Sequence, residues 1–366
     1  MDLQLQRMAK VLVNYSLALQ KGEGLLIMTN TAAMPLVKEV VRVALQAGGY
    51  PEVFDLHSEV REITLREGTD EQIMHMPKYQ ATMIQEYETI LQILADENTQ
   101  SMNGIDPARL ALSRQANKDL SEVMMRRIAD GSLRYSLTMF PTNAYAQDTN
   151  MSLSDFEDFV YRACFLNEED PVACWKAISL KQEHLISWLR GKHTIHLCGQ
   201  DTDLTLSVTG RTWLNDDGHI NFPAGEIYTS PVENSANGTI RFSFPASYRG
   251  RMLEDISLRF ENGVVVEARA AQGQDYLEKM LATDEGACRL GEFAFGNNRN
   301  VDRCTKNILF DEKMGGTVHL ALGASFPQAG GTNHSAVHWD MVCDLRKGGE
   351  VRVDGELFCK NGEFVI

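Results

Sequence analysis

The sequence lacks the features that mark several common classes of protein. No apolar run reaches the ~18 residues that a membrane-spanning helix needs, and the first residues lack the basic and then apolar pattern of a secretory signal. Seven cysteines are present, but none forms a C-x-x-C pair, so neither a zinc ribbon nor a disulfide framework is indicated. Positive charge is scarce, with 35 basic against 50 acidic residues and a net charge of −15. We therefore expect a cytoplasmic protein with reduced thiols that binds neither nucleic acid nor an anionic membrane.

The first half of the chain alternates strand and helix patterns. Residues 24–28 and 51–56 have strand patterns, and between them residues 34–45 have a helical pattern with Pro35 at its start and a glycine pair after its end. Such a βαβ unit implies parallel strands joined by a right-handed crossover. No G-x-G-x-x-G follows the first strand, so a dinucleotide site is not indicated. We interpret this half as an α/β layer that supports the rest of the protein.

The pattern changes after a helical segment at residues 151–190. Short strand patterns then recur between turns rich in glycine, asparagine and aspartate, one of them at residues 215–218, and one helix is expected near residues 274–283. A chain of 366 residues is long enough for two domains. We predict an α/β N-terminal domain with parallel strands at residues 1–185 and an α+β, largely antiparallel C-terminal domain at residues 186–366.

An alternating run at residues 337–341 places an imidazole beside a carboxylate. Because side chains i and i+2 of a strand share a face, His338 and Asp340 lie on one side of this strand and apolar residues on the other. A second imidazole, His319, lies in an apolar strand pattern, and Glu226 and Glu292 each follow a glycine. A charge buried in such surroundings needs a partner, since an unpaired buried charge is costly. A divalent metal ion is one such partner.

These five residues exceed what a single ion requires. A catalytic zinc uses three protein ligands and a water, whereas three carboxylates and two imidazoles match two ions about 3.5–4 Å apart with one carboxylate bridging them. Mixed oxygen and nitrogen ligands suit zinc, manganese or cobalt. Two such ions lower the pKa of a bridging water and polarise a carbonyl oxygen. The predicted chemistry is therefore hydrolysis.

At these residues the chain resembles the M29 metallopeptidases, the aminopeptidase T group. The resemblance is carried by residues 202–211, 221–233, 309–312, 319–323 and 338–340, and weaker similarity covers nearly the whole chain. It implies a two-domain subunit with a dimetal site in its C-terminal part, a homodimer whose active sites face an enclosed cavity, and release of N-terminal amino acids from peptides. By position, it places the metal ligands on Glu226, Glu292, His319, His338 and Asp340, and a further functional carboxylate on Glu312.

Two positions depart from the family pattern. Glu312 lies two residues farther from His319 than in the aminopeptidase T pattern. The family also has a tyrosine seven residues after the first histidine, thought to steady the tetrahedral intermediate, where this chain has Phe326. A hydroxyl donor aimed at an oxyanion is worth about 3–4 kcal/mol, so its loss would lower turnover without preventing metal binding. Tyr228 and Ser325 are the candidate substitutes for that donor.

Two alternative functions follow from the same residues. His319, His338 and Asp340 form a set of two histidines and one carboxylate, the ligand type of non-haem Fe(II) oxygenases, and ring-cleaving dihydroxypyridine dioxygenases resemble the M29 fold. The two glutamates weigh against an oxygenase, because a single iron would not need both. A non-catalytic relative that keeps the fold and the ligands is favoured only by Phe326. We predict a dimetal aminopeptidase ahead of both.

Overall fold

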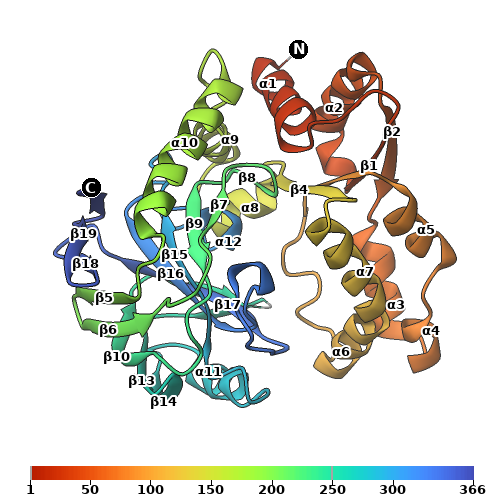
Figure 1. Ribbon diagram of the computed structural model, residues 1–366. Coiled ribbons are helices and arrows are strands. Elements are labelled where there is room, and N and C mark those ends of the chain that lie inside the picture. The colour runs from red at the N-terminus through yellow and green to blue at the C-terminus, as the bar shows by residue number, and fades with distance from the viewer. Residues whose placement is uncertain (1, 249) are drawn as a thin grey trace. The chain divides into compact units, whose positions relative to one another are not determined.

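The computed structural model describes residues 2–248 and 250–366, which form two compact units (Figure 1). The first comprises Met1–Val172 with Gly218–Phe222, and the second Ala173–Asp217 with Pro223–Ile366. The division falls in the first turn of α10 (Pro171–Leu189), whereas the predicted boundary at residue 185 lies inside this helix. The sequence changes from helical to strand patterns only after α10, so that change does not mark where the packing changes.

The first unit is built on a five-stranded parallel sheet, sheet A. Its strands in spatial order are β2 (Tyr50–Asp55), β1 (Gly24–Thr29), β3 (Thr89–Leu94), β4 (Arg134–Met139) and β8 (Asn221–Phe222). The α-helices of this unit are α1 (Leu3–Val11), α2 (Met34–Ala47), α3 (Ser58–Glu67), α4 (Asp70–Met74), α5 (Lys78–Glu86), α6 (Pro107–Ala116), α7 (Lys118–Ala129), α8 (Asn143–Asp148) and α9 (Leu153–Ala163). The predicted βαβ unit is confirmed, with β1 and β2 parallel and α2 between them.

The residues at the two ends of helix α2 explain where the helix begins and ends. Pro35 lies in its first turn, where the missing N–H has no helical partner to lose. Gly48 ends the helix in the left-handed conformation with φ of 82°, which a residue without Cβ adopts at little cost.

Across residues 2–248 and 250–366, no helix combines the length and apolarity needed to span a bilayer.

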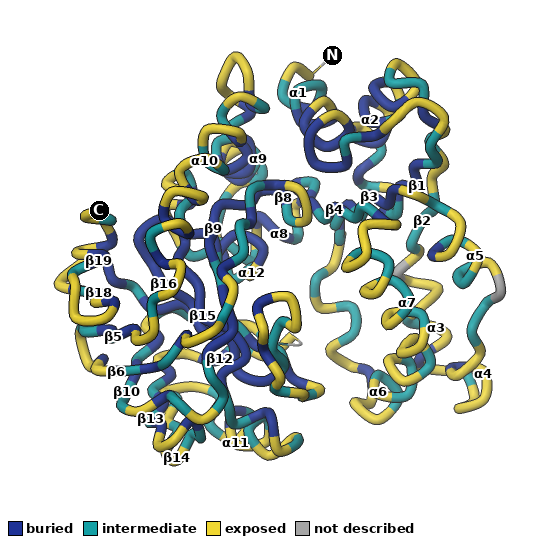
Figure 2. The backbone as a smooth tube through the Cα atoms, viewed as in Figure 1, coloured by how far each residue is buried: buried dark blue, intermediate teal, exposed yellow. Residues whose placement is uncertain are grey.

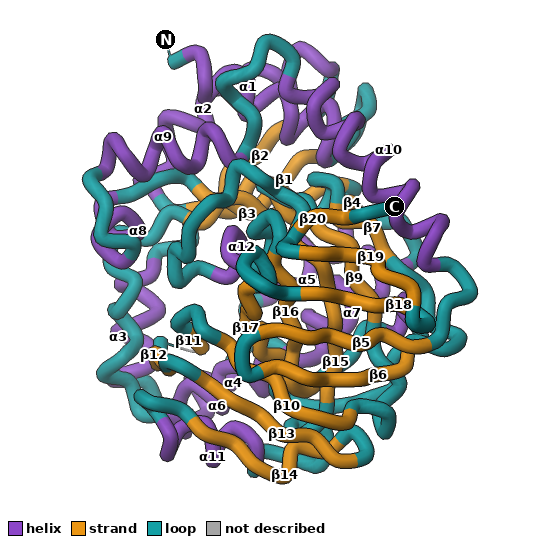
Figure 3. Tube along the Cα trace, turned by 90° about the vertical axis from the view of Figure 1, so that its left-hand side faces the viewer, coloured by secondary structure: helices purple, strands orange, loops and turns teal. Residues whose placement is uncertain are grey.

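In its described residues, the second unit contains two large antiparallel sheets and one two-stranded antiparallel sheet. Sheet B has eight strands in the order β14 (Val264–Arg269), β13 (Ile256–Glu261), β10 (Asn237–Phe242), β6 (Thr202–Ser207), β5 (Thr194–Gly199), β18 (Glu350–Val353), β19 (Glu356–Lys360) and β20 (Glu363–Phe364) (Figure 3). Sheet C has the order β17 (His338–Asp344), β16 (Thr317–Gly323), β15 (Leu290–Gly296), β9 (Glu226–Thr229) and β7 (Leu214–Asp216). The two-stranded sheet pairs β11 (Ala246–Tyr248) with β12 (Arg251–Leu253), and the remaining described elements are α11 (Gln274–Leu281), α12 (Ile308–Asp311) and the 3-10 helix η3 (Pro327–Ala329). The prediction that the C-terminal part of the chain is largely antiparallel is confirmed.

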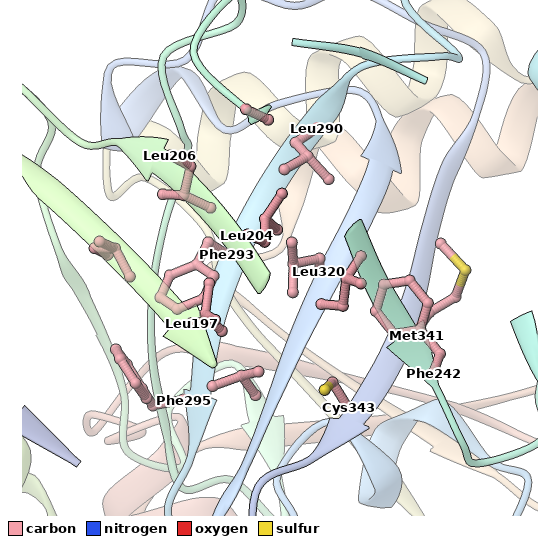
Figure 4. Close-up of a cluster of buried hydrophobic side chains, with 14 of the residues drawn as sticks. Leu197, Leu204, Leu206, Phe242, Leu290, Phe293, Phe295, Leu320, Met341 and Cys343 are labelled. Carbon is pink, nitrogen blue, oxygen red and sulfur yellow. The ribbon is translucent and has the colours of Figure 1, made fainter. Parts of the chain in front are cut away.

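The main core of this unit lies between sheets B and C. Figure 4 shows Leu197, Leu204 and Phe242 of sheet B close to Phe293 and Leu320 of sheet C. Every residue of β15 and β16 is buried (Figure 2), so both faces of these strands are shielded from water. Because side chains alternate along a strand, the face of sheet C that is turned away from this core carries a second, different set of side chains.

A bulge in β15 decides which of its residues face the core. The pairing with β16 shifts between Leu290 and Glu292, with Gly291 as the extra residue. Leu290 therefore joins the core (Figure 4). Glu292 points to the other face, because it precedes the core residue Phe293 on the strand. A Cβ atom on Gly291 would lie 2.1 Å from the carbonyl oxygen of Ala324, so only glycine fits at this position.

Candidate metal centre

The five predicted ligands share the face of sheet C that is turned away from the core. Glu292 lies opposite Ala321, which in turn lies opposite Asp340. The other three ligands follow by steps of two along the strands: His319 precedes Ala321, His338 precedes Asp340, and Glu226 lies opposite Gly296 of β15. Sheet register thus brings together side chains from four strands. The neighbouring positions on this face, Ala294, Gly296 and Ala321, carry small side chains or none.

The candidate ligand atoms fall into two groups that share one carboxylate. One group is Glu226, Glu292 and His319, the other is Glu292, His338 and Asp340, and within each group the atoms lie within 4.8 Å of one another. The Nε2 atom of His319 lies 3.5 Å from Glu292 Oε1, and the Nε2 atom of His338 lies 3.2 Å from Glu292 Oε2. Each oxygen of Glu292 thus faces a different imidazole, which is the placement that a carboxylate bridging two ions requires.

Several buried polar atoms of this face have no hydrogen-bond partner. Neither ring nitrogen of the fully buried His319 makes a hydrogen bond, and neither does Oε2 of Glu226 or Oδ1 of Asp340, although His319 Nε2 lies 3.5 Å from an oxygen of each glutamate. Leaving such groups unpaired in a protein interior is costly. The ring of His338 is already oriented, because its Nδ1 atom donates to the carbonyl oxygen of Ala324 at 2.8 Å and its Nε2 atom faces the carboxylates of Glu292 and Asp340. Divalent ions would satisfy these atoms, so the residues present fit a dimetal centre.

In the metal-free chain, protonation of the ligand side chains supplies part of the positive charge that metal ions would bring. Although burial opposes a charged imidazole, Glu226 and Glu292 raise the pKa of His319 to about 10. Burial likewise opposes the charge on His338, but Asp340 and Glu292 raise its pKa to about 10. Burial raises the pKa of Asp340 to about 6. Burial would also raise the pKa of Glu292, but contact with the two imidazolium groups holds it well below its usual range.

A lysine completes the charge arrangement beside the centre. Lys313 is fully buried, and its Nζ atom lies 2.6 Å from Glu226 Oε1, 2.7 Å from Asp216 Oδ2 and 2.8 Å from Glu312 Oε1. Glu312, the predicted further carboxylate, follows α12 and also lies in a group with His319 and Asp340 whose ligand atoms are within 4.8 Å of one another. The structure therefore brings Glu312 to the same place as the five predicted ligands.

Lys313 and Asp216 were not among the predicted site residues. Asp216 lies in a run that reads as a turn, but it is the last residue of β7 and pairs with Glu226 across the sheet. Lys313 follows Glu312 with no pattern that marks it as buried. The one available signal was its position directly after two acidic residues in a segment already tied to the site.

Aromatic rings line the sheet beside His338. The ring of Phe326 lies 5.2 Å from the imidazole of His338 and 5.1 Å from the ring of Tyr228, measured between centroids. Tyr228 shares the ligand face of β9 with Glu226, and only Ala294 separates it from His319 in the sheet register. Burial and the nearby carboxylates raise the pKa of Tyr228, so its phenol stays a hydrogen-bond donor. Ser325, the other candidate donor, already donates to the carbonyl oxygen of Asn333 at 3.1 Å.

Known proteins resemble this chain along its whole length. The sequence profile of a peptidase family, described as thermophilic metalloprotease (M29), matches residues 1–364. Aminopeptidase 2 of Geobacillus stearothermophilus is 26% identical over 93% of this chain and 91% of its own, and aminopeptidase T of Thermus thermophilus is 24% identical over 96% and 94%. The solved structure of wild-type AmpT from Thermus thermophilus superposes with a TM-score of 0.86, at 23% identity and with 99% of both chains covered. This agreement confirms the predicted fold class, and none of these matches supports the oxygenase alternative.

Proposed function

The chain belongs to the M29 family of thermophilic metalloproteases, and on that premise we propose that it is a metal-dependent aminopeptidase with a dimetal centre. The five proposed ligands are Glu226, Glu292, His319, His338 and Asp340. The observation that carries the proposal is the position of Glu292, whose two oxygens face His319 and His338 at 3.5 and 3.2 Å. Zinc, cobalt and manganese are the proposed ions, because the donor set mixes carboxylate oxygen and imidazole nitrogen.

The ions would supply the Lewis acidity and the activated water that hydrolysis of a peptide bond needs. The side chains around them have separate tasks. Glu312 is the proposed proton acceptor, because its carboxylate lies beside the ligands without belonging to either group that contains Glu292. Lys313 holds Oε1 of Glu226 and so leaves Oε2 directed at the ion site. General-base catalysis by a positioned carboxylate of this kind contributes typically about 10²–10⁴-fold.

The missing hydroxyl at Phe326 need not leave the reaction without a donor. The phenol of Tyr228 belongs to a ring in edge-to-face contact with Phe326, and both rings lie beside the ligands. We assign to the Tyr228 hydroxyl the task of donating to the developing oxyanion. Ser325 is the weaker candidate, since its hydroxyl is already used within its own loop.

Metal stoichiometry and peptide hydrolysis together test the function. The metal-free chain is reconstituted separately with zinc, cobalt, manganese and anaerobic Fe(II), and each form is given short peptides with a free or an acetylated N-terminus. Two ions per chain and release of the first amino acid from the free peptide alone are expected. Cleavage of the acetylated peptide would contradict an aminopeptidase, and a single iron with oxygen uptake but no hydrolysis would revive the oxygenase reading.

The quaternary state and location follow from the same resemblance. We propose a cytoplasmic homodimer that acts on peptides, in line with the strongly acidic composition, which disfavours binding to nucleic acid or anionic lipid. Light scattering on the purified chain would report the mass of the particle. A monomer at micromolar concentration would contradict the dimer while leaving the chemistry of the metal centre untouched.

A further inference from the structure

A second cluster of metal-ligating side chains lies on sheet B, outside the candidate metal centre. It consists of His196 and Cys198 on β5 and Asp203 on β6, and their ligand atoms lie within 4.8 Å of one another. Nothing in the proposed peptidase chemistry uses these residues. From their geometry we propose that this cluster, termed the hairpin site, binds one zinc ion or a similar borderline divalent cation, with a fourth position open to water.

The backbone fixes the three side chains of the hairpin site on one face. Cys198 lies directly opposite Asp203 in the pairing of β5 with β6, and His196 lies two residues before Cys198 on the same strand. The alternate residues Ile195 and Leu197 are completely buried in the core, so the ligand face is the outer face of sheet B. The hairpin between the strands is tight, since Gly199 pairs with Thr202. Ligands held on such a short hairpin lose little conformational freedom on binding an ion.

The three side chains converge on a common point. The Nε2 atom of His196 lies 2.7 Å from Asp203 Oδ1 and 3.3 Å from Cys198 Sγ. In a nucleophile–histidine–carboxylate triad the two partners must bond different ring nitrogens, but here both approach Nε2, and Nδ1 is farther from the thiol at 3.8 Å. The arrangement is therefore unsuited to proton relay and suited to shared coordination of an ion.

The donor chemistry selects the kind of ion. Thiolate, imidazole and carboxylate are the three side-chain ligands that zinc uses, and three protein ligands with one open position is a common zinc arrangement. Burial and the carboxylates of Asp203 and Glu350 raise the pKa of the Cys198 thiol, so binding would displace a proton from it. Arg352 and Lys360 both pair with Glu350, so this carboxylate offsets part of the positive charge beside the hairpin site. A thiolate and a carboxylate would then neutralise one divalent ion.

Cobalt provides a probe that separates the hairpin site from the candidate metal centre. A thiolate bound to Co²⁺ gives a near-ultraviolet charge-transfer absorption, and among the described residues no cysteine belongs to the metal-ligating groups around Glu292. The full chain, freed of metal and kept reduced, is titrated anaerobically with Co²⁺. We expect a charge-transfer band whose final intensity corresponds to one thiolate-bound cobalt per chain, in addition to any ions at the candidate metal centre, and which added Zn²⁺ removes.

Variants assign the band to its ligands. Cys198→Ser should abolish it, and Asp203→Asn should weaken cobalt binding by more than the ~10–100-fold that loss of an outer-shell partner typically costs. Cys288→Ser, which alters another partly exposed cysteine, is the matched control and should leave the band unchanged. Peptidase turnover should be unaffected in Cys198→Ser, because the two proposed sites lie on opposite outer faces of the two packed sheets. Absence of the band in the unmodified chain, or its persistence in Cys198→Ser, would overturn the proposal without bearing on the peptidase function.

Discussion

The Nζ atom of Lys313 lies 2.6 Å from Oε1 of Glu226, and both side chains are buried. The same amine also contacts Asp216 and Glu312, so one buried cation is shared by three carboxylates. Such a cation keeps negative charge inside the protein beside a site that must itself attract positive ions. It also fixes which oxygen of Glu226 is available to a metal.

Removing this cation should destabilise the protein. Lys313→Met leaves the buried carboxylates of Asp216 and Glu226 and the partly buried carboxylate of Glu312 without their counter-charge. Breaking a buried ion pair from one side typically costs about 3–5 kcal/mol. We expect a loss of that size in the free energy of unfolding of the metal-free chain, measured by urea denaturation. Lys279→Met, at an exposed lysine of α11, is the control and should change stability by less than about 0.5 kcal/mol. Equal stability of the two variants would show that Lys313 is not needed to compensate these charges.

The shared position of Glu292 predicts unequal losses of metal. Glu292→Gln removes a ligand from both groups and should cost both ions, whereas His338→Ala affects one group and should cost one. Elemental analysis after dialysis measures the ions per chain, and Glu285→Gln at an exposed carboxylate serves as the control. Hydrolysis should fall below detection in both site variants. A full complement of ions in Glu292→Gln would exclude it as the bridging ligand.

The paired rings of Tyr228 and Phe326 predict a rescue experiment. Tyr228→Phe should lower kcat by about 10²–10³-fold, the usual cost of one oxyanion donor, without changing metal content. Adding Phe326→Tyr to that variant should restore much of the loss, because the two rings are in contact and the new hydroxyl would lie beside the same site. Tyr79→Phe, at an exposed tyrosine, controls for the loss of a phenol. Unchanged kcat in Tyr228→Phe would assign the donor elsewhere.

The raised pKa values of the two histidines predict that metal binding releases protons. Without ions the pKa values of His319 and His338 are about 10, so at pH 7 both rings are protonated and must lose a proton before they coordinate an ion. Affinity for zinc should therefore rise with pH between about pH 6 and 10. Titration calorimetry in buffers of different ionisation enthalpy would count the protons. A binding enthalpy that is independent of the buffer would contradict this expectation.

The same pKa values set the sign of a stability change in the metal-free chain. The pKa of each histidine is higher in the folded than in the unfolded state, so folding gains stability from the charged rings below about pH 6.5. That contribution is lost as the pH rises towards 10. Thermal unfolding of the metal-free chain at pH 6.5 and pH 9.5 should show a lower Tm at the higher pH, and saturating metal should reduce the difference.

Much of the fold followed from local sequence patterns. The βαβ unit could be predicted because Pro35 and the glycines after residue 47 mark the ends of α2 between two apolar strands. The two adjacent helices α9 and α10 read as one helical segment, since the sequence between them gave no strand pattern. The division of the chain into units was harder to place, because it depends on which residues pack together and α10 runs across it.

The sequence by itself identified the five candidate ligands and showed which side chains of a single strand share a face. His338 and Asp340 had to share a face because strand side chains alternate, whereas Glu292 was marked in the sequence only by the glycine before it, and the bulge at Gly291 emerged from the structure. Only the tertiary structure decided that β17, β16, β15 and β9 pair in a register that joins these side chains, and that Lys313 and Asp216 complete their charge balance. The physical reason is that alternation acts between neighbours along the chain. Register and burial instead depend on contacts between residues far apart in sequence.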